Sequence, residues 1–348
     1  MRIEARLYEK VGDNKTKCLV CPHKCLIKDG RVGVCRTRIN EGGTLYTLIY
    51  GSITAEAVDP VEKKPLFHFW PGSETYSISS VGCNFACPWC QNWHISAGRP
   101  EETPVREIDS DDIVYKVAEM NLNSISYTYN EPSIWFEYVY DVAKLAHERG
   151  IANILVTNGY WSLESLEELR GLIDAANVDI KGFNGEFYMR YPKARLERVL
   201  EAVEEMRDQG VHLELTMLII PGVNDSPGEI GEFTEWAIKT LGEDVPIHFS
   251  RFFPHYQFTH TPPTPIKTLV EARGIARESG LNYVYVGNVP GSYEDTQCPR
   301  CGNTVIARRG YTILDWRLDD DHRCLKCGEK IPIVGKHVKR KSGYWPFY

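Results

Sequence analysis

The chain has 348 residues, enough for two to three domains at about 150 residues each. Its formal net charge of −7 argues against general affinity for nucleic acid or for membrane surfaces, so neither is an expected partner. The first residues are charged where a signal peptide is apolar, and no apolar run reaches the length of a membrane span, so we expect a cytoplasmic protein.

The 11 cysteines fall into three groups, each of which contains Cys-x2-Cys spacing. This spacing favours metal sites in a reducing compartment over disulfides. The first group lies within 18 residues and consists of Cys18, Cys21, Cys25 and Cys35. Its spacing fits structural zinc and also fits a second iron–sulfur cluster, and we take His23 as a bystander. Residues 1–73 are therefore predicted to form a cysteine-rich, metal-binding extension.

A turn-rich link is predicted between this extension and the rest of the chain. Residues 44–50 alternate between apolar and polar side chains enough to form a strand. Residues 55–72 contain three dipeptides with one proline each, which are typical of turns. We place a domain boundary near residue 74.

Strand and helix signals alternate between residues 74 and 290. The helix signals include a capped start at Ser110 and a proline-led start at Pro132. The strand-like segments are residues 74–81, 124–128, 151–157, 177–180, 211–219, 247–251 and 281–286. This alternation predicts an α/β fold with a parallel sheet. Because fewer than eight units are present, we expect an open, partial (β/α)6 TIM-like barrel.

The second cysteine group directly follows the first of these strands. Cys83, Cys87 and Cys90 have Cys-x3-Cys-x2-Cys spacing. A [4Fe–4S] cluster normally takes four thiolates, so three ligands on one loop leave one iron open to bind another molecule. His94 extends the run and offers the alternative of a four-ligand zinc site.

The third group is typical of a zinc ribbon. Two Cys-x2-Cys-Gly turns, separated by 22 residues, contain Cys298, Cys301, Cys324 and Cys327. Each glycine permits a tight turn around the thiolates. An additional cluster is the alternative. The predicted ribbon domain covers residues 291–348 and includes a basic segment, 336–341, that we expect to be solvated.

Polar residues follow several other strands. In barrels of this kind, functional residues lie at the carboxyl-terminal ends of the strands. We therefore expect residues 127–131, 157–159, 179–181 and 221–225 to surround one mouth together with the cysteine loop.

The three-cysteine spacing, with Trp89 before the last cysteine, resembles the signature of the radical S-adenosylmethionine (SAM) family. The resemblance implies a [4Fe–4S] cluster whose open iron binds SAM. It further implies reductive cleavage to methionine and a 5′-deoxyadenosyl radical, which abstracts hydrogen from a substrate.

Two narrower resemblances concern longer parts of the chain. Residues 74–260 resemble the core of activating enzymes for glycyl-radical enzymes, such as pyruvate formate-lyase-activating enzyme. The cysteine-rich start, the Pro88–Asn92 run, the Tyr-Asn-Glu-Pro stretch and the ribbon resemble a radical SAM group associated with AMMECR and Memo proteins, the AmmeMemoRadiSam system group.

The resemblance also implies which residues contact SAM. The family's Gly-Gly-Glu-Pro turn matches Tyr129, Asn130, Glu131 and Pro132, which gives Glu131 as the partner of the SAM ammonium. The alternative for Glu131 is a carboxylate favoured at a helix start. The further residues at family positions around the cofactor or the substrate mouth are Thr157, Asn158, Asp179, Lys181, His255 and Thr216, which stands where the family has an arginine.

Three functions remain open at this stage. The first is an oxidoreductase of the activating-enzyme type with a protein or peptide substrate. It would work under anaerobic conditions with an electron donor such as ferredoxin or flavodoxin, and with AMMECR/Memo-type proteins as partners. The second is a radical SAM enzyme that modifies a small metabolite. The third is a non-enzymatic, zinc-rich scaffold or nucleic-acid-binding module.

Overall fold

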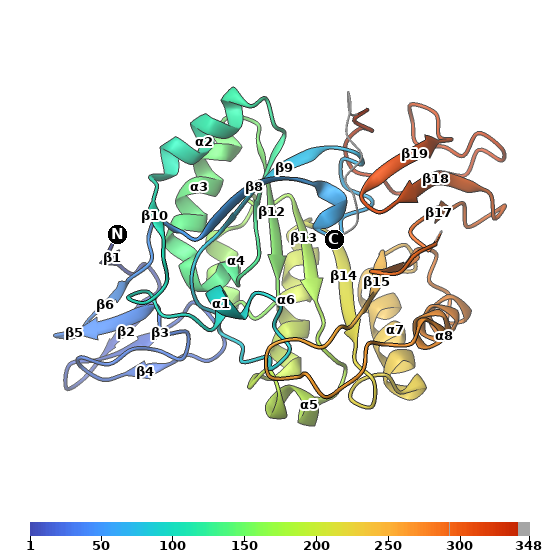
Figure 1. The fold of residues 1–348 in the computed structure, drawn as a ribbon. Helices are drawn as coiled ribbons and strands as arrows, with labels where there is room; N and C mark the ends of the chain where they lie inside the picture. The colour runs from blue at the N-terminus through green and yellow to red at the C-terminus, as the bar shows by residue number, and fades with distance from the viewer. Residues whose placement is uncertain (292, 340–348) are drawn as a thin grey trace.

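A computed structural model describes residues 1–291 and 293–339 of the protein (Figure 1). Its centre is an eight-stranded sheet with the strand order β16-β15-β14-β13-β12-β11-β9-β8. Seven of these strands are parallel, as the alternation predicts. They are β9 (Glu74–Ser79), β11 (Ser124–Tyr127), β12 (Ala152–Thr157), β13 (Ala175–Asp179), β14 (His212–Ile219), β15 (Ile247–Arg251) and β16 (Val284–Gly287).

Helices connect successive parallel strands and cover the outer side of the sheet (Figure 1). Their apolar faces are buried in one large core with the strands. The described helices of this region are α2 (Ser110–Glu119), η2 (Pro132–Trp135), α3 (Phe136–Glu148), α4 (Leu163–Glu168), α5 (Gly185–Arg190), α6 (Leu196–Asp208), α7 (Pro227–Leu241) and α8 (Ile266–Glu278). The prediction of an α/β fold with a largely parallel sheet is confirmed, although α5 was not predicted.

The prediction of a turn-rich link is wrong for its first residues. Residues 55–60 form strand β8 (Ala55–Pro60), which pairs antiparallel with β9 at the sheet edge. Pro60 ends the strand, a position where its missing N–H costs no ladder hydrogen bond. The chain then makes the short helix η1 (Val61–Lys63) and inserts Leu66 and Phe69 against Ile154 of β12. The sheet thus continues across residue 74.

The N-terminal residues form two small antiparallel sheets beside α3 and the start of the core (Figure 1). One sheet contains β1 (Ile3–Glu4), β6 (Thr44–Thr47) and β5 (Arg38–Glu41), and the other contains β2 (Tyr8–Val11), β3 (Lys15–Cys18) and β4 (Leu26–Ile27). A third pairing joins β7 (Ser52–Ile53) to β10 (Arg106–Glu107). Val20, Ile27 and Leu45 share the core of the barrel, so this region packs directly on it.

A small antiparallel sheet follows the barrel, formed by β17 (Thr296–Gln297), β18 (Thr304–Arg309) and β19 (Thr312–Trp316). Its core includes Phe67, Tyr283 and Tyr285, which lie near the amino ends of the parallel strands. Accordingly, it lies away from the short helix α1 (Trp93–Ser96), which follows the cysteine loop (Figure 1). Residues 292 and 340–348 of the predicted ribbon domain, including the last two of the basic segment, lie outside the described residues.

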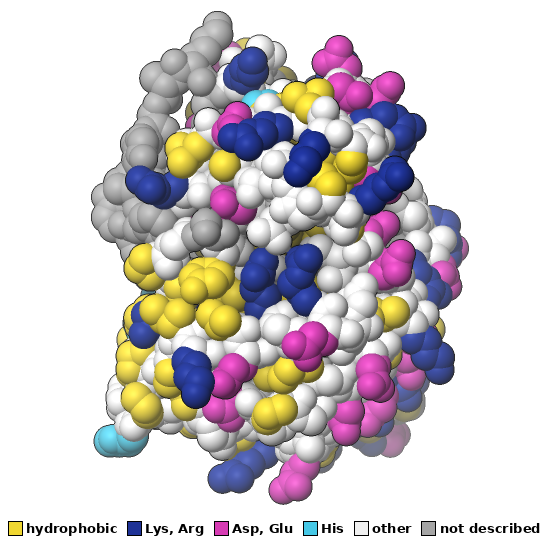
Figure 2. Space-filling view, turned by 90° about the vertical axis from the view of Figure 1, so that its right-hand side faces the viewer, with side chains coloured by type: hydrophobic (Ala, Val, Ile, Leu, Met, Phe, Trp, Pro, Cys, Tyr) yellow, Lys and Arg dark blue, Asp and Glu magenta, His cyan; other side chains and the backbone are white. Residues whose placement is uncertain are grey.

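The sequence has a nearly balanced charge composition, with 40 basic and 47 acidic residues. Basic and acidic side chains are interspersed on the face shown in Figure 2. Among the described helices, none is long and apolar enough to span a membrane.

Candidate functional site

The cysteine loop, residues 82–92, leaves the carboxyl end of β9 and ends at α1. Its first residue, Gly82, has a φ of +93°, and a Cβ there would lie 2.7 Å from Thr37 Cγ2 and 3.0 Å from the Cys35 carbonyl oxygen. Only glycine fits such a close approach in this backbone region. The N-terminal extension therefore presses on the loop immediately before Cys83.

The three thiols of the loop are half-buried and act on one another electrostatically. Burial raises the pKa of Cys83 well above its usual value and that of Cys87 to about 12. Lys181 opposes the shift at Cys87. Thiolates at such positions need a compensating cation, which a bound metal cluster supplies. His94 is exposed, and within the described residues it shares no closely spaced ligand group with these cysteines.

Asparagine side chains fix the shape of the loop. Asn130 accepts a hydrogen bond from the Ser80 N–H (2.9 Å) and donates to the Gly82 carbonyl (3.1 Å). Asn92 donates to the Tyr129 carbonyl at 2.8 Å. The turn after β11 thus holds both ends of the cysteine loop. Asn92 was not predicted as a site residue; the sequence marked it only as the last residue of the Pro88–Asn92 run.

A second brace comes from the end of β12. Asn158 Nδ2 donates to Asn84 Oδ1 at 2.8 Å and lies 3.8 Å from the sulfur of Cys83. Asn84 is buried and donates to the Ser133 hydroxyl at 3.1 Å. Asn84 also was not predicted. An asparagine next to a cysteine in the sequence does not by itself indicate a role, and its role became clear only from its hydrogen-bond partners in the structure.

Glu131 lies between the ends of β11 and β12. Its carboxylate accepts hydrogen bonds from Thr157 Oγ1 (2.8 and 3.0 Å), the Asn158 N–H (2.8 Å) and the Ser133 N–H (3.0 Å). The side chain is buried, and burial raises its pKa while these donors oppose the shift. The Ser133 side chain also lowers this pKa, so polar groups from three residues surround the carboxylate. Glu131 is also the cap of η2.

Asp179 and Lys181 follow β13. Lys181 Nζ donates to Asp179 Oδ2 at 2.8 Å. Burial alone would lower the pKa of Lys181, but Asp179 and the nearby cysteines raise it overall, so the amine carries a positive charge beside the thiols. Thr216 of β14 pairs with Asp179 in the sheet and donates to Asn177 Oδ1 at 2.9 Å.

Aromatic residues and the segment after β15 lie over the other side of the loop. Trp89 is buried and packs against Phe187, Tyr191 and Phe258 at ring distances of 5.5 to 5.8 Å. His255 is exposed, and its Nε2 lies 3.2 Å from the Gln91 carbonyl oxygen. The structure thus brings His255 to the rim of the cysteine loop.

A buried charged group near Tyr129 was missed by the sequence analysis. Asp59 accepts hydrogen bonds from Lys64 (2.7 Å), from Lys63 (2.8 Å) and from the Tyr129 hydroxyl. Burial lowers the pKa of Lys64 to about 8. These residues lie in the segment that we expected to be turns, which is why no pattern marked them.

The ribbon cysteines converge at the other end of the barrel. The sulfurs of Cys298 and Cys327 lie 3.5 Å apart and those of Cys301 and Cys324 lie 3.8 Å apart, and all four are within 4.8 Å of one another. Zinc–sulfur bonds of about 2.3 Å in a tetrahedron place sulfurs roughly 3.8 Å apart. The four residues therefore fit a zinc ion.

The fold and this site together define an α/β barrel protein with a three-cysteine loop at the carboxyl end of its first parallel strand. Residues 77–234 match the family model described as "Radical SAM superfamily". The chain is 46% identical to "Uncharacterized protein MJ0808" of Methanocaldococcus jannaschii over 333 residues, which cover 95% of this chain and 99% of that protein.

Two more distant relatives have described activities in their names. "Putative glycyl-radical enzyme activating enzyme MJ1632" of the same organism is 24% identical over 44% of this chain and 59% of its own length. "GTP 3′,8-cyclase" of Helicobacter pylori is 29% identical over 44% of this chain and 49% of its own length. The matched regions thus span less than two thirds of the first relative and about half of the second. The chain belongs to the radical SAM superfamily.

Proposed function

We propose that this protein is a radical SAM oxidoreductase of the activating-enzyme type that acts on a protein or peptide segment. The observation that carries the proposal is the half-buried loop with Cys83, Cys87 and Cys90, placed beside Glu131 and Lys181 at one end of the sheet. Family membership favours this function over a zinc-rich scaffold. The similarity to a putative activating enzyme supports the narrower assignment.

The three thiolates would hold a [4Fe–4S] cluster with one iron open. When bound, the cluster and SAM supply reductive cleavage to a 5′-deoxyadenosyl radical, which abstracts hydrogen from the substrate. Glu131 would be the negative partner of the SAM ammonium, and Lys181 supplies a cation beside the thiolates. Thr157 and Asn158 orient Glu131, while Tyr129 and Asn130 shape the backbone next to it.

The proposal includes further components. The reaction needs a one-electron donor such as ferredoxin or flavodoxin, and we propose AMMECR/Memo-type proteins as partners because of the resemblance in the cysteine-rich start and the ribbon. His255, at the rim of the loop, would line the substrate mouth.

A second candidate is radical modification of a small molecule, which the similarity to a GTP 3′,8-cyclase favours. Anaerobic incubation with SAM, reductant and deuterium-labelled substrates separates the two. We expect deuterium in 5′-deoxyadenosine when a partner protein carries deuterated glycine, with the unlabelled partner as control. Deuterium transfer only from a labelled metabolite, such as deuterated GTP, would reject the protein-substrate proposal.

We propose that the ribbon binds one zinc ion and takes no part in SAM cleavage. Replacing Cys301 and Cys327 with serine should remove one zinc per chain and leave the rate of SAM cleavage unchanged, because the ribbon packs near the amino ends of the strands. Zinc analysis and 5′-deoxyadenosine assays measure the two effects. Point substitutions are preferable to truncation, which would expose Phe67, Tyr283 and Tyr285. Loss of SAM cleavage in a variant that is still folded would contradict the assignment.

Glu131→Gln tests the proposed contact with the SAM ammonium. Loss of one charge-assisted hydrogen bond costs about 1.5–3 kcal/mol, so SAM should bind about 10- to 100-fold more weakly while the cluster remains. Calorimetric titration of SAM into the cluster-loaded protein measures the change. Thr157→Val, which removes a donor to Glu131 but keeps the carboxylate, is the matched control and should have the smaller effect. Equal SAM affinity of Glu131→Gln and the unaltered protein would place the ammonium elsewhere.

A further inference from the structure

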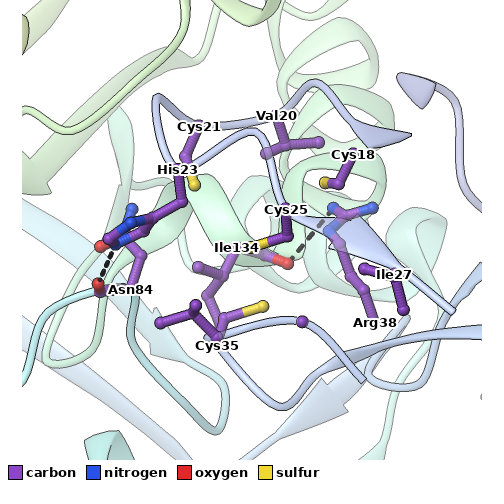
Figure 3. A pocket seen from close by; sticks show the side chains of 12 residues that line it. Cys18, Val20, Cys21, His23, Cys25, Ile27, Cys35, Arg38, Asn84 and Ile134 are labelled. Atoms are coloured by element: carbon purple, nitrogen blue, oxygen red, sulfur yellow. Dashed lines mark hydrogen bonds between the residues drawn. The ribbon is translucent and has the colours of Figure 1, made fainter. Parts of the chain in front are cut away.

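The four N-terminal cysteines surround a cavity that the proposed function does not use. Cys18, Cys21, Cys25 and Cys35 direct their sulfurs toward one common space (Figure 3). The open space between them is small, about 20 Å³, and its remaining wall is largely apolar, with Val20, Ile27 and Ile134.

The local fold explains why the thiols converge. Cys18 ends β3, and its N–H donates to the Cys25 carbonyl at 3.0 Å, so the intervening residues form a closed turn. Gly33 lies opposite this turn; a Cβ there would be 3.2 Å from Ile27 and 3.8 Å from the sulfur of Cys25. Glycine at this position thus lets the segment with Cys35 approach the other three cysteines.

This arrangement differs from that of the ribbon. The ribbon sulfurs lie within 4.8 Å of one another, close enough to enclose a single ion without a cavity between them. Within the described residues, no three of the N-terminal sulfurs form so close a group, and a cavity separates them. A cubane holds its thiolates farther apart than one zinc ion does, because irons and sulfides lie between them, so the wider spacing of the N-terminal sulfurs favours a cluster.

A buried ion pair lies in the wall of the cavity. Arg38 lines it with its side chain buried, and its two Nη atoms donate to Glu137 at 2.7 and 2.8 Å. The guanidinium therefore stays charged and fixed beside the thiols. We do not include His23 among the ligands, because its Nε2 is hydrogen-bonded to the Asn84 carbonyl at 2.8 Å.

From the cavity and its four converging thiols, we propose that Cys18, Cys21, Cys25 and Cys35 ligate a second [4Fe–4S] cluster. With four cysteine ligands this cluster has no open iron and does not bind SAM. It lies directly beside the cysteine loop, since Asn84 lines the cavity and Gly82 packs against the Cys35 carbonyl. The proposal is independent of the substrate and of SAM cleavage.

The test uses the full chain reconstituted anaerobically with ferrous iron and sulfide, then analysed for iron, sulfide and zinc. We expect about eight irons per chain in the unaltered protein and about four in a variant with Cys83, Cys87 and Cys90 all replaced by alanine. The four remaining irons should give the Mössbauer and EPR signals of a [4Fe–4S] cluster, with no change on addition of SAM. Because this variant leaves the N-terminal cysteines untouched, the proposed site is intact.

The converse variant is Cys35→Ser in the otherwise unaltered chain. It should lose about half of the iron while a SAM-responsive EPR signal remains. About four irons in the unaltered protein, all of them in a cluster that responds to SAM, together with a second zinc or with no further metal, would overturn the proposal. If the unaltered protein instead gave no SAM-responsive EPR signal but contained four irons that do not respond to SAM, the proposed function would be rejected and the second cluster would be supported.

Discussion

Replacing Cys87 with alanine is expected to abolish the formation of 5′-deoxyadenosine from SAM under anaerobic, reducing conditions. Cys87 is the middle ligand of the three-cysteine loop, and a cubane held by two thiolates loses both an iron ligand and its fixed position in the barrel. Chromatographic assay of 5′-deoxyadenosine should show a fall to the level without enzyme. Cys83→Ala and Cys90→Ala should behave alike.

Cys301→Ala provides the matched control, since it makes the same chemical change in the ribbon. It should lower the zinc content while leaving SAM cleavage intact. A Cys87→Ala protein that produced 5′-deoxyadenosine at the rate of the unaltered protein would end the assignment of the loop as the site of SAM cleavage.

The second large effect concerns a buried network around Glu214 of β14. Its carboxylate is fully buried and accepts hydrogen bonds from the His68 N–H (2.7 Å), His248 Nε2 (2.7 Å) and His212 Nε2 (3.2 Å). His68 Nε2 in turn lies 2.6 Å from the Tyr285 hydroxyl. This one carboxylate thus joins two strands of the barrel to the segment under the ribbon.

Glu214→Leu should lower the free energy of unfolding by at least about 3 kcal/mol. The substitution leaves two buried donors, from His68 and His248, and the partly buried His212 without an acceptor, and each loss of a buried partner costs about 1–3 kcal/mol. Chemical denaturation of the unaltered and variant proteins measures the difference. Glu235→Gln, at an exposed position of α7, is the control and should change stability little. A Glu214→Leu protein as stable as the control would show that the network does not stabilise the fold.

The contribution of Glu214 to the stability of the folded protein should also depend on pH. Burial opposes its charge, but donation from His212 and His248 lowers its pKa below the ordinary value of 4.5. A carboxyl group with a lowered pKa stabilises the folded state at pH above that ordinary value and loses this contribution as pH falls. The stability difference between Glu214→Leu and the unaltered protein should therefore be full near neutral pH and shrink below about pH 4.5.

The alternation of seven parallel strands with helices can be predicted from the sequence because its signals are local. Hydrophobic spacing, a proline at a helix start such as Pro132, and glycines after helices act within a few residues of each other. The spacing of the cysteines in each group is local in the same way, so the three ligand groups can be recognised without a structure.

Strand β8 shows where local signals fail. The Asp59–Pro60 pair favours a turn in isolation, but pairing with β9 and the edge position decide the conformation. The cluster of Asp59 and Lys64 beside Tyr129 depends on that strand, and its residues come from distant parts of the chain.

The amino-acid order alone therefore predicts an α/β fold with a largely parallel sheet, and it places cysteine groups before, within and after that fold. The tertiary structure adds what each group faces: a cavity against the cysteine loop for the first, Glu131 and Lys181 for the second, and the amino ends of the strands for the third. Contacts such as that between Gly82 and Cys35 join residues far apart in the chain. These contacts depend on burial and packing across the whole molecule, so no local sequence pattern predicts them.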